Sequence, residues 1–221
     1  MKKVLIIKKI HDSGIKLLDS RKDFSYEIIE DPETSVLINK VQDCDAISLK
    51  TSKFGSDLIN AANKLKIISR HGVGHDNVDL ETVKKKKIIL SITTNSNATS
   101  VAEHVFFMML SISRGADTYD KTVKEGKFLN RKNLELSKEL WNKNILIAGF
   151  GRVGKNLIKK CIGFDMNIFV YDPFVDKKII DSLGGKKIES NLEIHKVLSP
   201  NIRLHFHIHS GFKLLINKFI I

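Results

Sequence analysis

The stretch NILIAGFGRVGKNLIKKCIGFDMNIFVYD, residues 144–172, decides the fold of the second half of the chain. It opens on a short continuous apolar run, Ile145–Ala148, which is typical of a buried parallel strand. Glycines follow at G-x-G-x-x-G spacing, and a helical segment connects them to a second apolar run, Ile168–Tyr171. This order predicts a strand–helix–strand unit that binds a dinucleotide; a glycine-rich turn in another kind of α/β protein is the alternative.

Each glycine of this motif has its own physical task. Gly149 allows a tight turn, Gly151 lets a pyrophosphate approach the backbone, and Gly154 lets the helix pack against the strand. The helix directs free N–H groups and the positive end of its dipole at the phosphates, and Arg152 is expected to lie along them. Asp172, at the end of the second strand, stands where a carboxylate accepts hydrogen bonds from a ribose, so the motif predicts NAD rather than NADP.

Length and composition suit a globular protein. With 221 residues the chain has room for one large or two small domains, and its apolar content of 42% is ordinary. The net charge of +12 would suit a nucleic-acid partner. However, the excess is lysine spread along the chain, and its densest run, Lys84–Lys87, is explained as a solvated helix end. We therefore expect no nucleic-acid partner, and a basic surface that attracts anionic ligands.

The sequence indicates a cytoplasmic protein. Its two cysteines, Cys44 and Cys161, lie far apart and lack metal-ligating neighbours, which fits a reducing compartment and inert thiols. Lys8 and Lys9 interrupt the apolar opening too early for a signal peptide, and no apolar run approaches the length of a membrane span. We expect neither a membrane contact nor a metal site.

The first half of the chain alternates between short apolar runs and amphipathic segments. The runs predict strands at residues 2–7, 26–29, 46–49, 65–69 and 88–92, with helices between them at 12–20, 35–41, 56–62 and 80–85. This alternation predicts a parallel sheet covered by helices on both faces.

From Thr99 onward the pattern indicates a long helix. Its apolar side chains lie nearly all round: Val101, Ala102, Val105, Phe106, Met109, Leu110 and Ile112. We therefore expect a buried helix, capped at its amino end by residues 96–100. A more polar helix at 117–127 and a loop at 131–140 then lead to the strand at Asn144.

Further motifs follow one another in a fixed order. They are RHGVGHDNVDL at residues 70–80, SVAEH at 100–104, KEGKF at 124–128, FDM at 164–166 and YDP at 171–173. Together with the glycine motif they resemble the D-isomer-specific 2-hydroxyacid dehydrogenases, and most closely their phosphoglycerate dehydrogenase and hydroxypyruvate reductase branch. The agreement runs from about residue 2 to about residue 198.

The resemblance implies an α/β fold with two domains. Residues 1–95 would form the first part of a discontinuous, flavodoxin-like substrate domain. Residues 96–198 would form an incomplete Rossmann-type NAD-binding domain, followed by an atypical tail, 199–221. The active site would lie in the cleft between the domains, and the long helix would contribute to a homodimer contact.

Two loops would hold the substrate, if the resemblance is carried over residue by residue. One presents backbone N–H groups to the substrate carboxylate: Gly72, Val73 and Gly74. The other lines the substrate side: Lys50, Thr51 and Ser52. For the two glycines a plain tight turn is the alternative, and the neighbouring His71 and His75 are expected to be loop residues rather than catalysts.

The cofactor contacts follow in the same way. Val73 would lie near the nicotinamide, Arg152 and Val153 would hold the pyrophosphate of NAD, and Asp172 would bind its adenosine ribose. These residues join the three glycines of the G-x-G-x-x-G motif as the expected cofactor site.

The implied reaction is hydride transfer between NAD and a small anionic D-2-hydroxy acid or 2-keto acid. It needs an arginine that orients the substrate, a histidine that moves the proton and a glutamate that holds this histidine. In the family all three come after the equivalent of Asp172, and none can be mapped onto this chain, which stops at Ile221. We therefore expect a truncated dehydrogenase that is inactive alone; a non-catalytic NAD-binding or dimerising remnant is the alternative.

The tail departs from the family pattern. Where the family has a strand entered by Ser-Asp, this chain reads PNIRLHFHIH at residues 200–209. If Arg203 and Leu204 use the AT-rich codons AGA and TTA, a shift of one nucleotide makes them read Asp-Tyr, and the flanking codons can then read Ser before them and Ile-Ser-Ile after them. We therefore expect residues 200–221 to be an out-of-frame translation. The alternating histidines have no acid or cysteine nearby, which disfavours metal binding by them.

Overall fold

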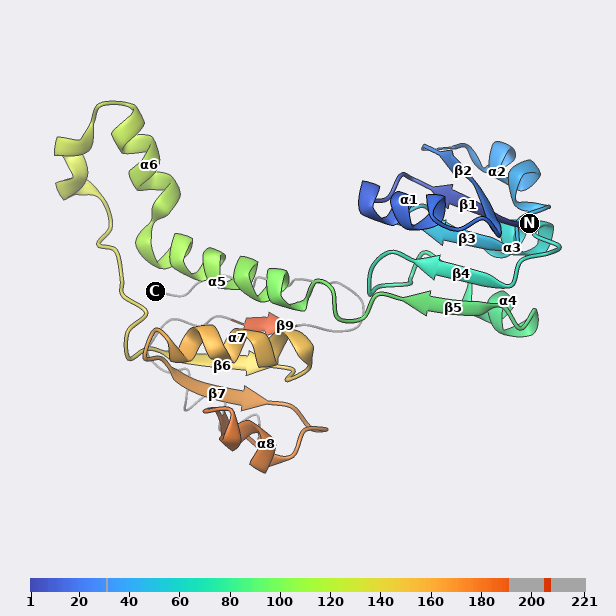
Figure 1. Cartoon of the computed structure of the whole chain (residues 1–221). Coiled ribbons are helices and arrows are strands. Elements are labelled where there is room, and N and C mark those ends of the chain that lie inside the picture. The colour runs from blue at the N-terminus through green and yellow to red at the C-terminus, as the bar shows by residue number, and fades with distance from the viewer. Residues whose placement is uncertain (31, 191–204, 208–221) are drawn as a thin grey trace. The chain divides into compact units, whose positions relative to one another are not determined.

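The computed structural model describes residues 1–30, 32–190 and 205–207 (Figure 1). They form two compact units, the first of residues Met1–Ser96 and the second starting at Asn97. Both units are built from parallel strands joined by helices, which confirms the predicted α/β fold. In this part of the chain, no helix is both long enough and apolar enough to cross a membrane.

The first unit contains a five-stranded parallel sheet with the strand order β2-β1-β3-β4-β5. Its strands are β1 (Lys2–Ile7), β2 (Phe24–Ile29), β3 (Ala46–Leu49), β4 (Ile67–Arg70) and β5 (Ile89–Ile92). Its helices are α1 (Asp12–Asp19), α2 (Thr34–Val41), α3 (Ser56–Ala61) and α4 (Leu80–Lys85). Every strand and helix predicted for this half is present, with small shifts at the ends.

One face of this sheet carries the core of the first unit. Ile47 and Ile68 pair across β3 and β4 and are fully buried. Helices α2, α3 and α4 cover this face, because Leu37, Leu58 and Val83 pack into the same cluster. Burial of these apolar side chains is the main stabilising contribution to the unit.

Both faces carry helices, as predicted, but within the described residues the opposite face is covered less completely. Val4 and Ile6 of β1 are buried there, but Ile89 on β5 is 62% exposed and its neighbours Ser69 and Ser91 are exposed too. The strand order explains the difference. Only the β1–β2 crossover runs toward β2, while the next three run toward β5. Right-handed crossovers therefore place α1 on one face and α2–α4 on the other.

The second unit contains a four-stranded parallel sheet with the strand order β8-β7-β6-β9. Its strands are β6 (Asn144–Ala148), β7 (Asn167–Tyr171), β8 (Lys186–Lys187) and β9 (His205–His207). Its helices are α5 (Ala98–Arg114), α6 (Ala116–Lys124), α7 (Arg152–Ile162) and α8 (Lys177–Ser182), with a 3₁₀ helix η1 (Phe128–Asn133). The predicted strand–helix–strand unit is confirmed as β6–α7–β7.

Helix α5 is buried along one face and not all round, which corrects the prediction. It runs along α7 (Figure 1), and its residues Val105 and Met109 join Leu157 in the core. On its outer side Phe107 is 62% exposed and Ile112 is 42% exposed. Apolar residues of α5 therefore lie both on its packed face and on its exposed face, so their presence in the sequence did not indicate which face is buried.

The amino end of α5 also differs from the prediction. The helix begins at Ala98, inside the stretch that was expected to cap it, and the side chain of the capping residue Asn97 makes no capping hydrogen bond. Its carboxyl end has a glycine cap. Gly115 adopts a left-handed conformation with φ +59°, and its N–H donates to carbonyl oxygens of the last turn.

Most of the tail lies outside the described residues, including the proposed frame change and the last of the alternating histidines, His209. The exception is β9, His205–His207, which pairs in parallel with β6.

Candidate substrate and nucleotide sites

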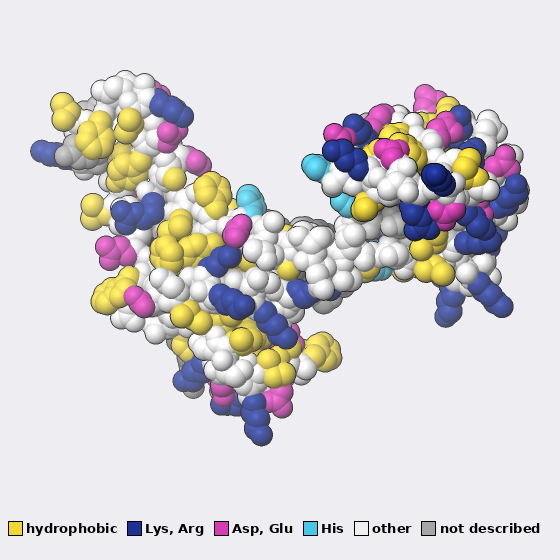
Figure 2. Space-filling model, viewed as in Figure 1, with side chains coloured by type: hydrophobic (Ala, Val, Ile, Leu, Met, Phe, Trp, Pro, Cys, Tyr) yellow, Lys and Arg dark blue, Asp and Glu magenta, His cyan; other side chains and the backbone are white. Residues whose placement is uncertain are grey.

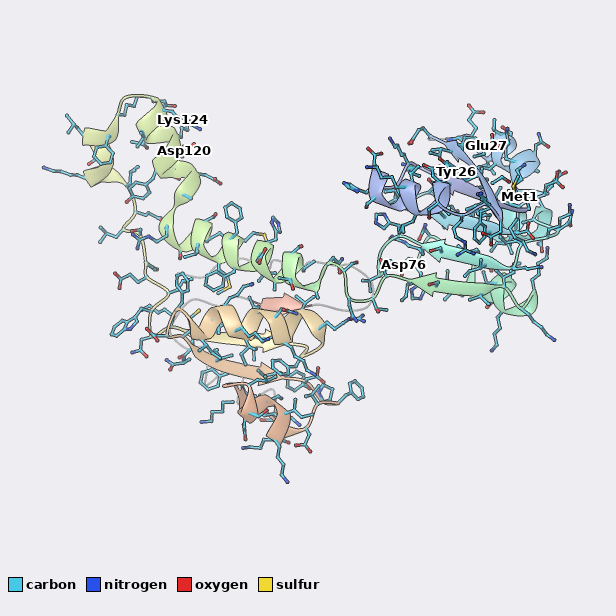
Figure 3. The ribbon with its side chains drawn as sticks, in the orientation of Figure 1. Met1, Tyr26, Glu27, Asp76, Asp120 and Lys124 are labelled. Atoms are coloured by element: carbon cyan, nitrogen blue, oxygen red, sulfur yellow. The ribbon has the colours of Figure 1, made fainter. Side chains whose placement is uncertain are left out.

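In the first unit, the loops predicted to hold the substrate lie together at the carboxyl edge of the sheet. Residues 50–52 follow β3, residues 71–77 follow β4, and Thr93 follows β5. Figure 3 labels Asp76 in the loop after β4. This loop is tied to β3 at its start, because the His71 N–H donates to the Leu49 carbonyl at 2.7 Å. Carboxyl edges of parallel sheets are where α/β proteins bind ligands.

Asn77 joins two of these loops. Its side-chain Nδ2 donates to the carbonyl oxygens of Lys50, at 3.2 Å, and Ser52, at 2.7 Å. Its own carbonyl accepts a 2.7 Å hydrogen bond from the Phe54 N–H. One side chain thus holds the backbone of residues 50–54 against the end of the loop that follows β4.

Gly72 joins the same loop to β5. Its N–H donates to Thr93 Oγ1 at 2.8 Å, and its carbonyl accepts from the Thr93 N–H at 3.0 Å. Gly72 has φ +141°, a conformation that a residue with a side chain rarely adopts. The loop is therefore pinned at Gly72 and again at Asn77.

Between these two attachment points, backbone N–H groups are available as hydrogen-bond donors. Within the described part of the chain, the N–H groups of residues 73–77 have no hydrogen-bond acceptor. Of the three predicted donors they include Val73 and Gly74, whereas the Gly72 N–H already donates to Thr93. The His75 ring lies close to the loop backbone, with its Nδ1 3.4 Å from the Val73 carbonyl oxygen. A run of unpaired backbone N–H groups attracts an anion.

Positive side chains lie beside this loop. The Arg70 guanidinium packs over Gly72 and donates to the His71 carbonyl, while its Nε is buried without a partner among the described residues. Lys50 is half-buried, and its ammonium donates at 2.8 Å to the carbonyl of Lys9, in the loop after β1. Their charges favour an anionic ligand at this edge of the sheet.

In the second unit, the glycine loop has the geometry that its sequence predicted. Gly149 has φ +92°, and its N–H donates to the Tyr171 carbonyl at 2.8 Å. A Cβ on Gly154 would lie 2.6 Å from the Gly149 carbonyl oxygen, so the helix could not pack this closely with any other residue. Among the described residues, a Cβ on Gly151 would meet no heavy atom within 4 Å, which leaves open space above the loop there.

Asp172 is bonded to the glycine loop. Its Oδ2 accepts a 2.6 Å hydrogen bond from the Phe150 N–H, and its Oδ1 accepts a 2.9 Å hydrogen bond from the Phe174 N–H. The side chain is half-buried at the end of β7. A carboxylate oxygen has room for more than one hydrogen bond, so these contacts leave capacity for the hydroxyl groups of a ribose.

The first turn of α7 completes this site. Its first intrahelical hydrogen bond runs from the Lys155 N–H to the Gly151 carbonyl, so the preceding N–H groups have no intrahelical acceptor. Arg152 is exposed at the start of the helix, whereas Val153 packs its side chain against the core and can offer only its backbone to a ligand. Open space, the amino end of a helix and a carboxylate together fit a dinucleotide.

The two cysteines are buried thiols. Burial raises the pKa of Cys161 to about 12, and it also raises the pKa of Cys44. Both thiols are therefore protonated and poorly reactive at neutral pH. In the ranges that the structure describes, no three His, Cys, Asp or Glu side chains gather as metal ligands would.

Comparison with known proteins identifies the family. The family model of the D-isomer specific 2-hydroxyacid dehydrogenase catalytic domain matches residues 4–165. D-3-phosphoglycerate dehydrogenase of Methanocaldococcus jannaschii is 32% identical over 197 residues, which cover 89% of this chain and 37% of that protein. The chain belongs to the D-isomer-specific 2-hydroxyacid dehydrogenases.

Other members of this dehydrogenase family are similar in sequence or in structure. Glyoxylate reductase of Thermococcus litoralis is 31% identical, over 85% of this chain and 59% of that protein. The structure of D-lactate dehydrogenase from Aquifex aeolicus, complexed with NAD and lactic acid, has a TM-score of 0.73 at 25% identity, covering 86% of this chain and 56% of that one. The chain thus spans little more than a third of the phosphoglycerate dehydrogenase and over half of the other two.

Sequence reasoning missed the residues that shape the two candidate sites without being expected to bind a ligand. Asn77 and Thr93 hold the loop after β4, and the Phe150 N–H holds Asp172. A polar residue directly after an apolar strand, as at Thr93, was the available signal. Its hydrogen-bond partner, Gly72, lies 21 residues away, and the sequence around Thr93 does not indicate this partner.

Proposed function

We propose that this chain binds NAD through its second unit and a small anionic 2-hydroxy or 2-keto acid through its first. In this proposal residues 1–95 belong to the substrate domain and residues 96–198 to the NAD-binding domain of a D-2-hydroxyacid dehydrogenase. The observation that carries it is the glycine loop with Asp172 bonded to it, because open space, the amino end of α7 and a fixed carboxylate occur together there.

The residues of the second unit would bind and orient the cofactor. The pyrophosphate would lie over Gly151 and the first turn of α7, with Arg152 beside it, and the ribose hydroxyls would donate to Asp172. A carboxylate at this position disfavours the extra phosphate of NADP. When bound, the nicotinamide supplies the group that accepts or donates hydride. This chain's own contribution would be to hold it in place.

The residues of the first unit would bind the acid. The substrate carboxylate would accept hydrogen bonds from the Val73 and Gly74 N–H groups, while Lys50, Thr51 and Ser52 line the substrate side. Arg70 and Lys50 place positive charge at this edge, which suits a phosphoglycerate-like or hydroxypyruvate-like anion. The names of the relatives, phosphoglycerate dehydrogenase and glyoxylate reductase, support the same class of substrate.

We expect binding without turnover by this chain alone. No residue of the sequence maps to the family's catalytic arginine, glutamate or histidine, so the step that moves the proton lacks its donor. A non-catalytic NAD-binding protein is therefore the second candidate function. An assay of NADH oxidation with hydroxypyruvate tests this expectation: measurable turnover by the chain alone would contradict it, together with the second candidate function.

The second unit also supports a homodimer. Large apolar side chains are exposed over α5, α6, η1 and the segment after it: Phe107, Val123, Phe128, Leu129, Leu136 and Trp141. Figure 2 shows hydrophobic side chains gathered over this part of the molecule. Exposed apolar groups of this extent mark an interaction surface, and a second copy of the chain is the partner that we propose.

Calorimetric titration of the chain with NAD and with NADP tests the proposed function. We expect NAD to bind and NADP to bind at least about tenfold more weakly, since a carboxylate opposes the added phosphate. Equal affinities would contradict the role of Asp172, and no binding of either nucleotide would contradict the proposal for the second unit. Oxalate, a stable dicarboxylate, tests the first unit in the same instrument.

A further inference from the structure

Thr93 lies outside every set of residues predicted to bind a ligand, yet it makes two hydrogen bonds to the proposed substrate loop. Its Oγ1 accepts from the Gly72 N–H at 2.8 Å, and its own N–H donates to the Gly72 carbonyl at 3.0 Å. The peptide groups on both sides of Gly72 are thereby fixed to the end of β5.

This attachment matters because the N–H groups of the loop that have no acceptor among the described residues come directly after Gly72. They begin at the next residue, Val73, and run to Asn77. Gly72 itself sits at φ +141°, and glycine has more conformational freedom than any other residue. Without an external attachment, the start of the run would have no fixed direction.

The far end of the run is fixed independently. Asn77 bonds the carbonyls of Lys50 and Ser52 through its side chain. The loop between Gly72 and Asn77 is therefore held at each end by a hydrogen-bonding side chain, Thr93 at its start and Asn77 at its end. The N–H groups between these two points take no part in either set of hydrogen bonds.

We propose that Thr93 is a positioning residue for anion binding. By accepting a hydrogen bond from the Gly72 N–H, its hydroxyl fixes the orientation of the Val73 and Gly74 N–H groups before the anion binds. Preorganised donors bind more tightly because less freedom is lost on binding. This inference rests on the proposed function of the loop as the site for the substrate carboxylate.

Thr93→Val tests it, because valine keeps the shape of threonine and removes the hydroxyl. We expect the affinity for oxalate to fall about fivefold, the effect of one lost hydrogen bond. Thr93→Ser, which restores the hydroxyl, should recover the wild-type affinity. Thr94→Val is the matched control: Thr94 is the next residue, is also half-buried, and has no hydrogen bond from its side chain among the described residues.

Each outcome decides a different claim. Oxalate binding to the wild type, weakened by Thr93→Val alone with unchanged affinity for NAD, supports the inference. Equal oxalate binding by wild type and Thr93→Val would overturn it and leave the proposed function standing. If the wild type does not bind oxalate, the proposed substrate loop and this inference both fail. If Thr93→Val weakens NAD binding equally, or serine does not restore affinity, Thr93 acts on folding and the inference is overturned.

In amide NMR spectra the inference has a second readout. Oxalate should shift the Val73 and Gly74 amide resonances of the wild type strongly and the Gly72 amide weakly, because the Gly72 N–H already donates to Thr93. In Thr93→Val the Gly72 amide should become responsive to oxalate. A residue that only stabilised the fold would not change which amides respond.

Discussion

The Asp172 carboxylate accepts a 2.6 Å hydrogen bond from the Phe150 N–H, so the predicted ribose-binding residue is part of the glycine loop's own structure. We expect Asp172→Asn to lower the affinity for NAD about tenfold and to reduce the preference over NADP, because the amide keeps an acceptor but loses the charge. Titration with both nucleotides measures this. Asp165→Asn, at an exposed carboxylate before β7, should bind as the wild type does. An unchanged preference in Asp172→Asn would show that the charge does not select the nucleotide.

Two glycines of the motif should respond to alanine in opposite ways. Gly154→Ala places a Cβ 2.6 Å from the Gly149 carbonyl oxygen and should lower the free energy of unfolding by about 1–3 kcal/mol. Gly151→Ala meets open space and should leave stability within about 0.5 kcal/mol of the wild type, while its methyl group blocks the pyrophosphate.

Urea denaturation and NAD titration of the two variants separate these effects. Gly163→Ala, at the other end of α7, is the control for NAD binding, because its Cβ would make only ordinary contacts. Undiminished NAD binding by Gly151→Ala would contradict the position proposed for the pyrophosphate.

The partly covered sheet of the first unit predicts unequal effects of one substitution. Ile68→Val removes a methyl group from the core and should cost about 1 kcal/mol. Ile89→Val makes the same change on β5, where the side chain is 62% exposed, and should cost almost nothing. Both positions remain β-branched, so strand propensity is matched. Equal losses in urea denaturation would mean that something covers Ile89.

Acid should destabilise the first unit through two carboxylates. The Lys3 backbone N–H, donating to Asp45 at 3.0 Å, holds the pKa of that carboxyl below its usual value. The Thr82 backbone N–H, at the amino end of α4, lowers the pKa of Asp79 in the same way. A pKa that is lower in the folded than in the unfolded state means that the stabilisation is complete above the unfolded value, about pH 4, and is lost as pH falls toward the folded value.

Urea denaturation at neutral and at acidic pH measures this loss. Asp45→Asn and Asp79→Asn should each reduce the fall in stability between the two conditions, while Asp57→Asn, at an exposed carboxylate on α3, should not. If both variants keep the wild-type dependence on pH, other carboxylates cause it.

The alternation of strands and helices and the glycine loop could be predicted because each depends on residues close together in sequence. The runs 2–7 and 46–49 became strands with the predicted bounds, and Gly149 and Gly154 occupy positions that only glycine fits. The exposed side of α5 could not be predicted in this way. An apolar side chain such as Phe107 has the same spacing whether or not a neighbour packs on it.

The coverage of the first sheet was open to prediction in principle. The strand order, once known, determines which face each crossover helix covers, but the order depends on pairings between distant segments such as β1 with β3. The attachments of Asn77 and Thr93 depend on the same pairings. The ligand-binding roles of residues 50–52 and 72–74 remain predictions until the titrations are done.

The hydrogen bond between Phe150 and Asp172 closes a loop of the chain, and this has a consequence for the order of folding. It joins residues only 22 apart, the same separation as between Val4 and Tyr26, which pair in the first unit, whereas the pairing of Val4 with Ala46 joins residues 42 apart. Shorter closures lose less chain entropy and form faster. As the chain leaves the ribosome, α5 is already made when β6, α7 and β7 emerge, and the face of α5 that carries Val105 and Met109 is ready to receive them. The glycine loop can therefore take its final form while the rest of its sheet is still being synthesised.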